Sequence, residues 1–121
     1  MYGVTVESSF SALHRVSLPD GTLEPLHGHD WRVRVEFRAA ALDARGMVVD
    51  FLEVRAALDD ITRGLQYQDL NRHPAFAERL PTAELVAEYV CGEFVRRGLT
   101  QVRWVEITEA PGCIATYERP V

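Results

Sequence analysis

Eight consecutive residues, WRVRVEFR at 31–38, alternate without interruption between apolar and charged side chains. Alternation at period two is the pattern of a β-strand that buries one face and leaves the other in water. Such strands are typical of antiparallel sheets, because strands of parallel sheets are apolar on both faces. The stretch therefore predicts an antiparallel sheet with one covered face, and other segments must supply its partner strands and its cover.

Three further segments are predicted to be strands of the same sheet. Residues 2–14 favour a strand that precedes it, with apolar positions on one face at period two. Residues 101–109 and 114–119 favour two closing strands, joined by a turn that contains Pro111 and Gly112. Four strands of this length leave open edges, so we expect the subunits to pair their sheets into a closed barrel.

Two amphipathic helices are predicted between the strand pairs. The first follows a short extended piece, GMVVD, with Asp50 as its N-cap, and it repeats apolar residues near helical spacing at Phe51, Val54, Leu58, Ile61 and Leu65. The second has Thr82 as its N-cap and ends at Gly98, after an irregular stretch over residues 66–81. The order β-β-α-α-β-β predicts an α+β fold: a single domain, residues 1–121, with two helices on one face of a four-stranded antiparallel sheet.

Composition argues against several classes of function. A net charge of −5 does not suit nucleic-acid binding, which needs a basic face. No apolar run approaches the roughly 18 residues of a membrane helix, so no membrane partner is expected. No signal-peptide pattern is visible and there are only two cysteines, so a reduced, cytoplasmic setting is expected. All 13 basic residues are arginine, which excludes Schiff-base chemistry on a lysine.

Three histidines are predicted to converge at one end of the sheet. His27 and His29 are two residues apart at the start of a strand, so their side chains point to the same face. His14 ends the preceding strand, and an antiparallel return brings cross-strand neighbours within about 5 Å. Three neutral imidazoles with an open fourth position are typical of a catalytic zinc site. The alternative is that these histidines only cap a loop.

Six motifs occur in order along nearly the whole chain: FSALH, HGH, GMVVDF, LN, PTAE and EAPGCIATY. In this order they resemble the 6-pyruvoyl-tetrahydropterin synthase and 6-carboxy-tetrahydropterin synthase family. The resemblance implies a tunnelling fold, with trimers whose sheets close into a twelve-stranded barrel and that usually stack as hexamers. It also implies Zn²⁺ bound by His14, His27 and His29, and a pterin-like small molecule as substrate.

The resemblance further assigns residues to substrate binding. The family's ring-anchoring glutamate matches Glu109, and the segment that lines the ring pocket matches Thr82 and Ala83. The assignment is chemically reasonable, because a carboxylate can accept two parallel hydrogen bonds from the amino and N–H edge of a pterin. The alternative for Glu109 is a solvated carboxylate at the end of a strand.

The family's proton-transfer residues are missing from this chain. The family has a cysteine four positions before the first histidine of HGH, where this chain has Leu23. An Asp-His pair precedes LN in the family, whereas Gln66 and Tyr67 stand here. Glutamine cannot ionise, and a tyrosine with its ordinary pKa near 10 is a poor base. The chain is therefore identified as a divergent member of the family.

Glu24, in EPLHGH, is the candidate base. This stretch resembles an ExxHGH variant of the family that cuts the side chain of dihydroneopterin in an aldolase-like reaction. On a flexible loop, Glu24 would reach the open position of the metal; alternatively, it is a solvated loop carboxylate. Asp69 and His73 are either displaced replacements for the Asp-His pair or ordinary loop and cap residues.

Three functions remain open at this level. The first is a zinc-dependent carbon–carbon lyase or synthase acting on dihydroneopterin or its triphosphate. The second is a specialised biosynthetic paralogue that works on a different heterocycle or bond. The third is a non-catalytic protein that binds zinc and a pterin.

Overall fold

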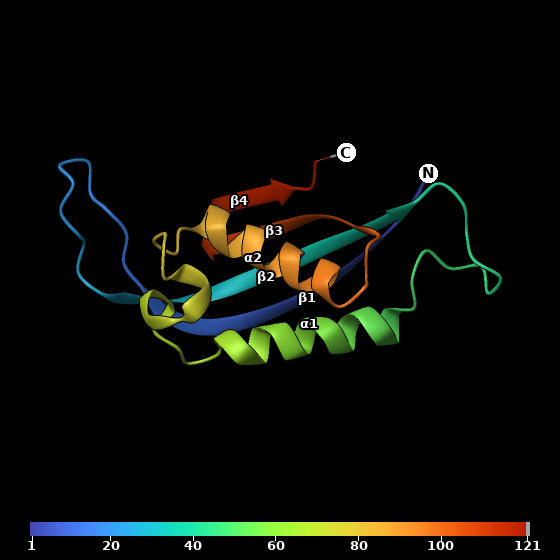
Figure 1. The fold of residues 1–121 in the computed structure, drawn as a ribbon, viewed down its shortest axis with the longest axis horizontal. Coiled ribbons are helices and arrows are strands. Elements are labelled where there is room, and N and C mark those ends of the chain that lie inside the picture. Colours follow the sequence, from blue (N-terminus) through green and yellow to red (C-terminus); the bar gives the residue numbers. More distant parts are fainter. Residues whose placement is uncertain (121) are drawn as a thin grey trace.

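The computed structural model describes residues 1–120 and confirms the predicted order of elements (Figure 1). The sheet is antiparallel throughout, with the strands in chain order. Its strands are β1 (Tyr2–His14), β2 (His27–Ala39), β3 (Val102–Ala110) and β4 (Cys113–Glu118). Between the strand pairs lie helices α1 (Phe51–Leu65) and α2 (Ala83–Arg96), and the short 3-10 helices η1 (Leu70–Arg72) and η2 (Pro74–Phe76).

The alternating stretch of β2 forms the centre of the core. Its four apolar side chains are fully buried: Trp31, Val33, Val35 and Phe37. The charged residues between them face away from the helices, as the period-two pattern predicts. Burying such side chains contributes roughly 1.5–3 kcal/mol each, so this strand is a principal source of stability.

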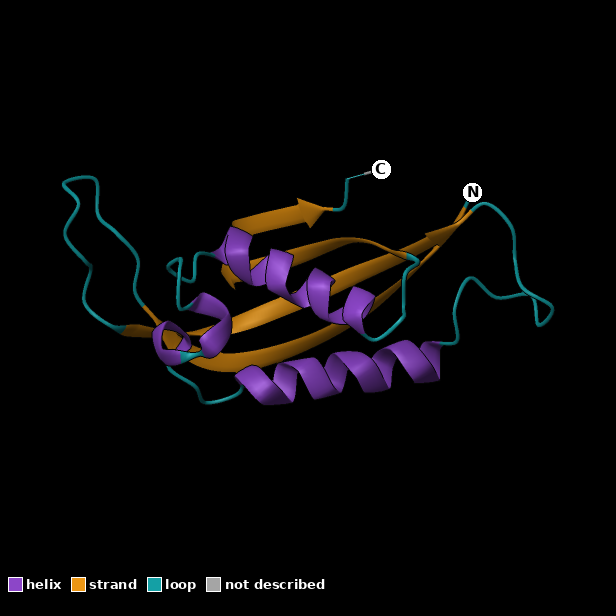
Figure 2. Ribbon diagram, viewed as in Figure 1, coloured by secondary structure: helices purple, strands orange, loops and turns teal. Residues whose placement is uncertain are grey.

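Both helices lie on the same face of the sheet, and the other face is left uncovered by them (Figure 2). The apolar residues predicted to line one side of α1 are buried except for Phe51, which is 55% exposed. The prediction for Phe51 was wrong because the first turn of α1 lies at the end of the sheet. There Phe51 lines a shallow pocket with Tyr2 and Met47 instead of entering the core.

The predicted caps of both helices are present. The Asp50 carboxylate accepts a hydrogen bond from the Leu52 N–H at 2.8 Å, and Gly98 follows α2 with a φ of 81°. Residues 46–49 contain bends at Gly46, Val48 and Val49 rather than the predicted extended piece. The backbone N–H of Asp43 donates to the Met47 carbonyl, which folds this segment back on itself.

The ends of the sheet differ in what they carry. The long connection between β1 and β2 projects from one end, and the loop over residues 40–50 projects from the other, near the N-terminus (Figure 1). The end of β1, the start of β2 and the η helices meet at the first end. Within residues 1–120, no helix is long and apolar enough to cross a membrane.

Candidate metal centre and substrate pocket

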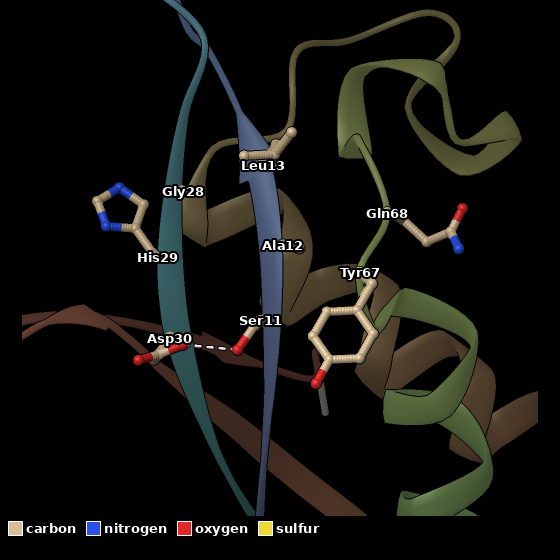
Figure 3. A pocket seen from close by; sticks show the side chains of 8 residues that line it. All are labelled: Ser11, Ala12, Leu13, Gly28, His29, Asp30, Tyr67 and Gln68. Atoms are coloured by element: carbon tan, nitrogen blue, oxygen red, sulfur yellow. Dashed lines mark hydrogen bonds between the residues drawn. The ribbon is translucent and has the colours of Figure 1, made fainter.

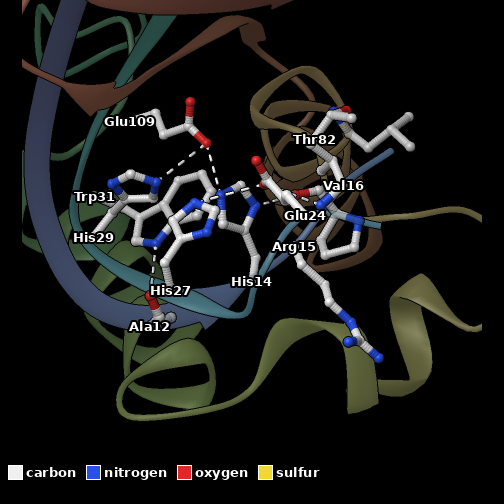
Figure 4. A network of polar contacts seen from close by, with 12 residues as sticks. Ala12, His14, Arg15, Val16, Glu24, His27, His29, Trp31, Thr82 and Glu109 are labelled. Atoms are coloured by element: carbon white, nitrogen blue, oxygen red, sulfur yellow. Dashed lines mark hydrogen bonds and ion pairs between the residues drawn. The ribbon is translucent and has the colours of Figure 1, made fainter. Parts of the chain in front are cut away.

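The three histidines lie together at the junction of β1 and β2. His14 is the register partner of His27, and His29 pairs with Ala12 two positions along. Their ligand atoms all lie within 4.8 Å of one another, and the rings point toward a common centre (Figure 4). His14 is 1% exposed, whereas His27 and His29 are half-buried. The predicted convergence is therefore present, with one side accessible from outside.

Backbone carbonyls orient two of the rings. The Nδ1 atom of His14 is 2.8 Å from the carbonyl oxygen of Pro81, and that of His27 is 2.8 Å from the carbonyl oxygen of Pro25. A carbonyl can only accept, so Nδ1 carries the proton and Nε2 keeps its lone pair. Histidines that bind a metal through one ring nitrogen typically donate a hydrogen bond from the other ring nitrogen in this way.

The donor set fits a metal ion. The Nε2 atom of His14 is buried and has no hydrogen-bond partner within residues 1–120, which is costly unless the nitrogen has another use. Burial lowers the pKa of His29, although the neighbouring Glu109 carboxylate acts in the opposite direction. A lower pKa favours the neutral imidazole that a metal requires.

Trp31 forms a rigid floor beneath the histidines. Its ring packs edge-on against His14 and His29, with centroids 4.7 and 5.5 Å away. The indole Nε1–H donates to the carbonyl of Ala12 at 3.2 Å, which satisfies the buried polar atom of this side chain. Packing of this kind limits the rotamers that the imidazoles can adopt.

Two carboxylates approach the cluster from different elements. Oε1 of Glu109, near the end of β3, is 2.8 Å from Nε2 of His14 and 3.6 Å from Nε2 of His29. Oε1 of Glu24 is 3.6 Å from Nε2 of His27. The accessible side of the histidine cluster is therefore bordered by negative charge.

Glu24 is held in place and does not lie on the flexible loop that we expected. Its backbone N–H donates to the Val16 carbonyl at 3.0 Å, and its carboxylate accepts from the Val16 N–H at 3.1 Å. Ser17 and Leu23 form a bridge just beyond, so the connection between β1 and β2 continues the sheet for a few residues. These bonds fix the Glu24 carboxylate beside His27.

A surface pocket of about 440 Å³ adjoins the cluster on the Glu109 side. Ala83, at the start of α2, lines it together with Glu109 and Cys113. Its size falls within the range of small-molecule sites. Thr82 is not among its lining residues; its hydroxyl accepts a hydrogen bond from the Leu85 N–H at 3.2 Å and caps α2.

Comparison with known proteins identifies the family. The sequence model of the family described as 6-pyruvoyl tetrahydropterin synthase matches residues 3–120, almost the whole chain. The chain belongs to this family.

Individual proteins are similar to this chain in sequence or in fold. A dihydroneopterin monophosphate aldolase from Pyrococcus furiosus is 28% identical over 96 residues, which cover 79% of this chain and 76% of the aldolase. A Caenorhabditis elegans 6-pyruvoyl tetrahydropterin synthase has a TM-score of 0.81 at 24% identity, covering 99% of this chain and 98% of that one. A Plasmodium vivax synthase, solved with a catalytic glutamate replaced by alanine, has a TM-score of 0.76 at 17% identity and the same coverage.

The positions where the family carries its Asp-His pair have a different use here. The Gln66 side chain accepts a hydrogen bond from the Ser11 N–H at 2.7 Å, and the Tyr67 N–H donates to the Ser11 carbonyl at 2.6 Å. Leu13 in turn donates its N–H to the Gln68 carbonyl. This segment therefore lies along the outer edge of β1, and the Gln66 side chain is used as a hydrogen-bond acceptor for the backbone of β1.

Tyr67 is unusual in its backbone and in its exposure. Its φ of 58° is the only positive value at a non-glycine residue within residues 1–120, and its side chain is 81% exposed. Its ring lies beside Ser11 at the rim of a pocket of about 380 Å³, which Asp30 also lines (Figure 3). His29 also lines this pocket. A left-handed tyrosine is strained, and such strain is common at functional sites.

Asp69 and His73 are cap residues, as in the simpler of the two interpretations. The Asp69 carboxylate accepts from the Asn71 N–H at 3.0 Å at the start of η1. The His73 Nδ1 accepts from the Ala75 N–H at 3.1 Å at the start of η2. Both side chains are thus engaged in local turns.

Sequence reasoning missed the carbonyl partners at Pro25 and Pro81. A backbone acceptor leaves no signature in residue type, so only the fold could place it. The clue that does exist is that each proline lies within two residues of a predicted site residue, His27 or Thr82.

Proposed function

We propose that this protein is a zinc-dependent lyase that shortens the side chain of a dihydropterin, dihydroneopterin or its triphosphate, by aldolase-like cleavage. The observation that carries the proposal is the Glu24 carboxylate, held 3.6 Å from the Nε2 atom of His27 at the accessible side of a three-histidine cluster. The family's usual cysteine position is Leu23, which cannot take a proton. The similarity to a dihydroneopterin monophosphate aldolase supports this class of reaction.

In the proposed reaction, Glu24 removes the proton of the 2′-hydroxyl. The C1′–C2′ bond breaks, the C2′ oxygen becomes a carbonyl, and glycolaldehyde (phosphorylated, if the substrate is) leaves. The electron pair of the broken bond passes to C1′ and its conjugated ring imine, and C1′ then takes up a proton. The remaining product is 6-hydroxymethyl-dihydropterin.

His14, His27 and His29 would hold the zinc ion. When bound, zinc would polarise the side-chain oxygens and stabilise the charge that develops on them. This suits a chain without lysine, because the Schiff-base route to the same stabilisation is closed. A catalytic glutamate was replaced in the Plasmodium vivax structure, so a glutamate has a catalytic precedent on this fold.

Glu109 and Ala83 are proposed to receive the pterin ring. Both line the pocket next to the cluster, and the Glu109 carboxylate can accept two hydrogen bonds from the amino and N–H edge. Thr82 would contribute by fixing the start of α2, since its hydroxyl is used as the cap.

We also propose that the protein assembles as a trimer or hexamer of identical subunits. β1 and β4 are the outer strands of the sheet, and over residues 2–10 no backbone partner covers the outer edge of β1 within the described chain. Open edges of this kind are paired or covered in stable proteins. Pairing of β4 with β1 of the next copy would close a ring.

A second candidate is a specialised paralogue that acts on a different heterocycle or bond. It is favoured by the replacements Leu23, Gln66 and Tyr67, of which Gln66 is committed to a backbone hydrogen bond. A purely binding function without catalysis is the third candidate. It differs from both in predicting no product from any substrate.

The deciding experiment is incubation of zinc-loaded protein with dihydroneopterin, its monophosphate and its triphosphate, followed by mass analysis. We expect 6-hydroxymethyl-dihydropterin, with glycolaldehyde or its phosphate as the second product. His29→Ala is the matched control, because it removes one metal ligand and keeps Glu24. Binding of all three compounds without any product would contradict the lyase proposal.

A further inference from the structure

The contact between His14 and Glu109 is not a hydrogen bond. Nε2 of His14 and Oε1 of Glu109 are 2.8 Å apart, yet Nε2 has no hydrogen-bond partner within residues 1–120. When the ring proton is on Nδ1, which faces the Pro81 carbonyl, neither Nε2 nor the carboxylate oxygen has a hydrogen to donate. The distance alone therefore does not explain why these two atoms lie together.

The protonation of the ring makes the contact more unusual. Pro81 holds the proton on Nδ1 of His14, so Nε2 presents a lone pair to the carboxylate. Two electron-rich atoms at this distance repel one another unless positive charge is shared between them. The same oxygen is 3.6 Å from Nε2 of His29, so it approaches two inward-facing nitrogens at once.

We propose that Glu109 is a fourth ligand of the metal in the protein without substrate. Two atoms bound to one zinc ion at about 2.0–2.2 Å each lie about 3.3–3.6 Å apart at a tetrahedral angle. The distance from Oε1 to Nε2 of His29, 3.6 Å, lies in this range, and the distance to Nε2 of His14, 2.8 Å, is shorter. Glu109 would thus close the position that three histidines alone leave open.

Coordination of the metal and capture of the ring compete for this carboxylate. Accepting two parallel hydrogen bonds from a pterin edge needs both carboxylate oxygens, whereas coordination keeps Oε1 at the metal. Arrival of the ring therefore draws Glu109 off the metal and frees the fourth position for the oxygens of the substrate side chain. This second step rests on the proposed function, but the ligand role of Glu109 does not.

The ligand role is tested with cobalt(II) as the probe and without any pterin. Cobalt titrations followed by visible absorption are compared for the wild type, Glu109→Gln and Glu109→Asp. Glu109→Gln should weaken cobalt binding by about 10–100-fold, the range seen when groups that support a metal site are removed. Its spectrum should also shift, because solvent takes the place of the carboxylate. Glu109→Asp, which keeps a carboxylate on a shorter side chain, should fall between the two.

Glu106→Gln is the matched control for charge. Glu106 lies on the same strand and faces Arg34 at 3.4 Å, on the side of the sheet away from the helices. It should bind cobalt with the affinity and spectrum of the wild type. If Glu109→Gln also matches the wild type in both readouts, Glu109 is not a ligand.

Adding a dihydropterin without a side chain, which offers the ring edge to Glu109 but no side-chain oxygens to the metal, to the cobalt-loaded protein tests the displacement. The wild-type spectrum should change on binding, and Glu109→Gln, which has no carboxylate to lose, should lack this change. Binding is followed separately by pterin fluorescence. A pterin that binds without altering the wild-type cobalt spectrum overturns the displacement step. If no pterin binds while the titrations still show Glu109 as a ligand, the proposed substrate is wrong and the ligand assignment stands.

Discussion

Replacing Glu24 by glutamine tests the proposed base with little change to the structure. The Glu24 oxygen that accepts from the Val16 N–H has a counterpart in the amide oxygen of glutamine, so the connection between β1 and β2 keeps its anchor. What is lost is the ability to take a proton. General-base catalysis is typically worth about 10²–10⁴ in rate, or about 3–5 kcal/mol of activation free energy. Turnover of Glu24→Gln should fall by that factor.

The assay is the rate of 6-hydroxymethyl-dihydropterin formation by zinc-loaded protein, with zinc content and pterin binding measured in parallel. Zinc content should stay near that of the wild type, because three histidines hold the metal and the Glu24 carboxylate approaches only one of them, His27. Asp20→Asn is the control: it removes a carboxylate from the tip of the same loop, where the Asp20 side chain accepts hydrogen bonds from the N–H and the hydroxyl of Thr22. A wild-type rate in Glu24→Gln would refute the reasoning and make Tyr67 the next group to test.

The remaining predictions concern metal, stability, reactivity and assembly. His27→Ala and His29→Ala should each lose most of the bound zinc, measured by metal analysis, while circular dichroism shows that the fold is retained. Full retention of zinc in both variants would show that these histidines are not metal ligands. Thr82→Ala should lower the free energy of unfolding by about 1 kcal/mol in urea titrations, since the α2 cap is lost; an unchanged midpoint would mean that the cap contributes nothing. A maleimide should label exposed Cys113 well before Cys91, whose pKa is raised by burial, as peptide mass analysis would show; equal labelling would contradict the buried position in α2. Light scattering at micromolar concentration should give a trimer or hexamer, and a stable monomer would contradict the assembly proposal.

The sheet and the meeting of the three histidines could be predicted because both depend on local periodicity. The alternation from Trp31 to Phe37 determines which face is buried, and the same period places His27 and His29 on one side. Antiparallel pairing with the preceding strand then brings in His14. The helix caps were predictable for a similar reason, since their residue types act within three or four positions.

Contacts between distant segments could not be predicted in this way. Phe51 fits the helical stripe, but its burial depends on where the sheet ends. The loop that holds Glu24 is ordered by its hydrogen bonds to Val16, which no composition rule indicates. Likewise, the family resemblance assigns Glu109 to binding the pterin ring. That its carboxylate points toward His14 depends on how the fold brings β3 and β1 together.

The segment that runs along the end of β1 has a consequence for how the sheet can grow. Tyr67 and Gln68 already use the outward-facing backbone groups of Ser11 and Leu13. A strand from another copy of the chain can therefore pair with β1 only as far as Phe10, and it meets this blocked stretch if it slides further. The blocked stretch therefore limits the registers that an incoming strand can adopt on β1.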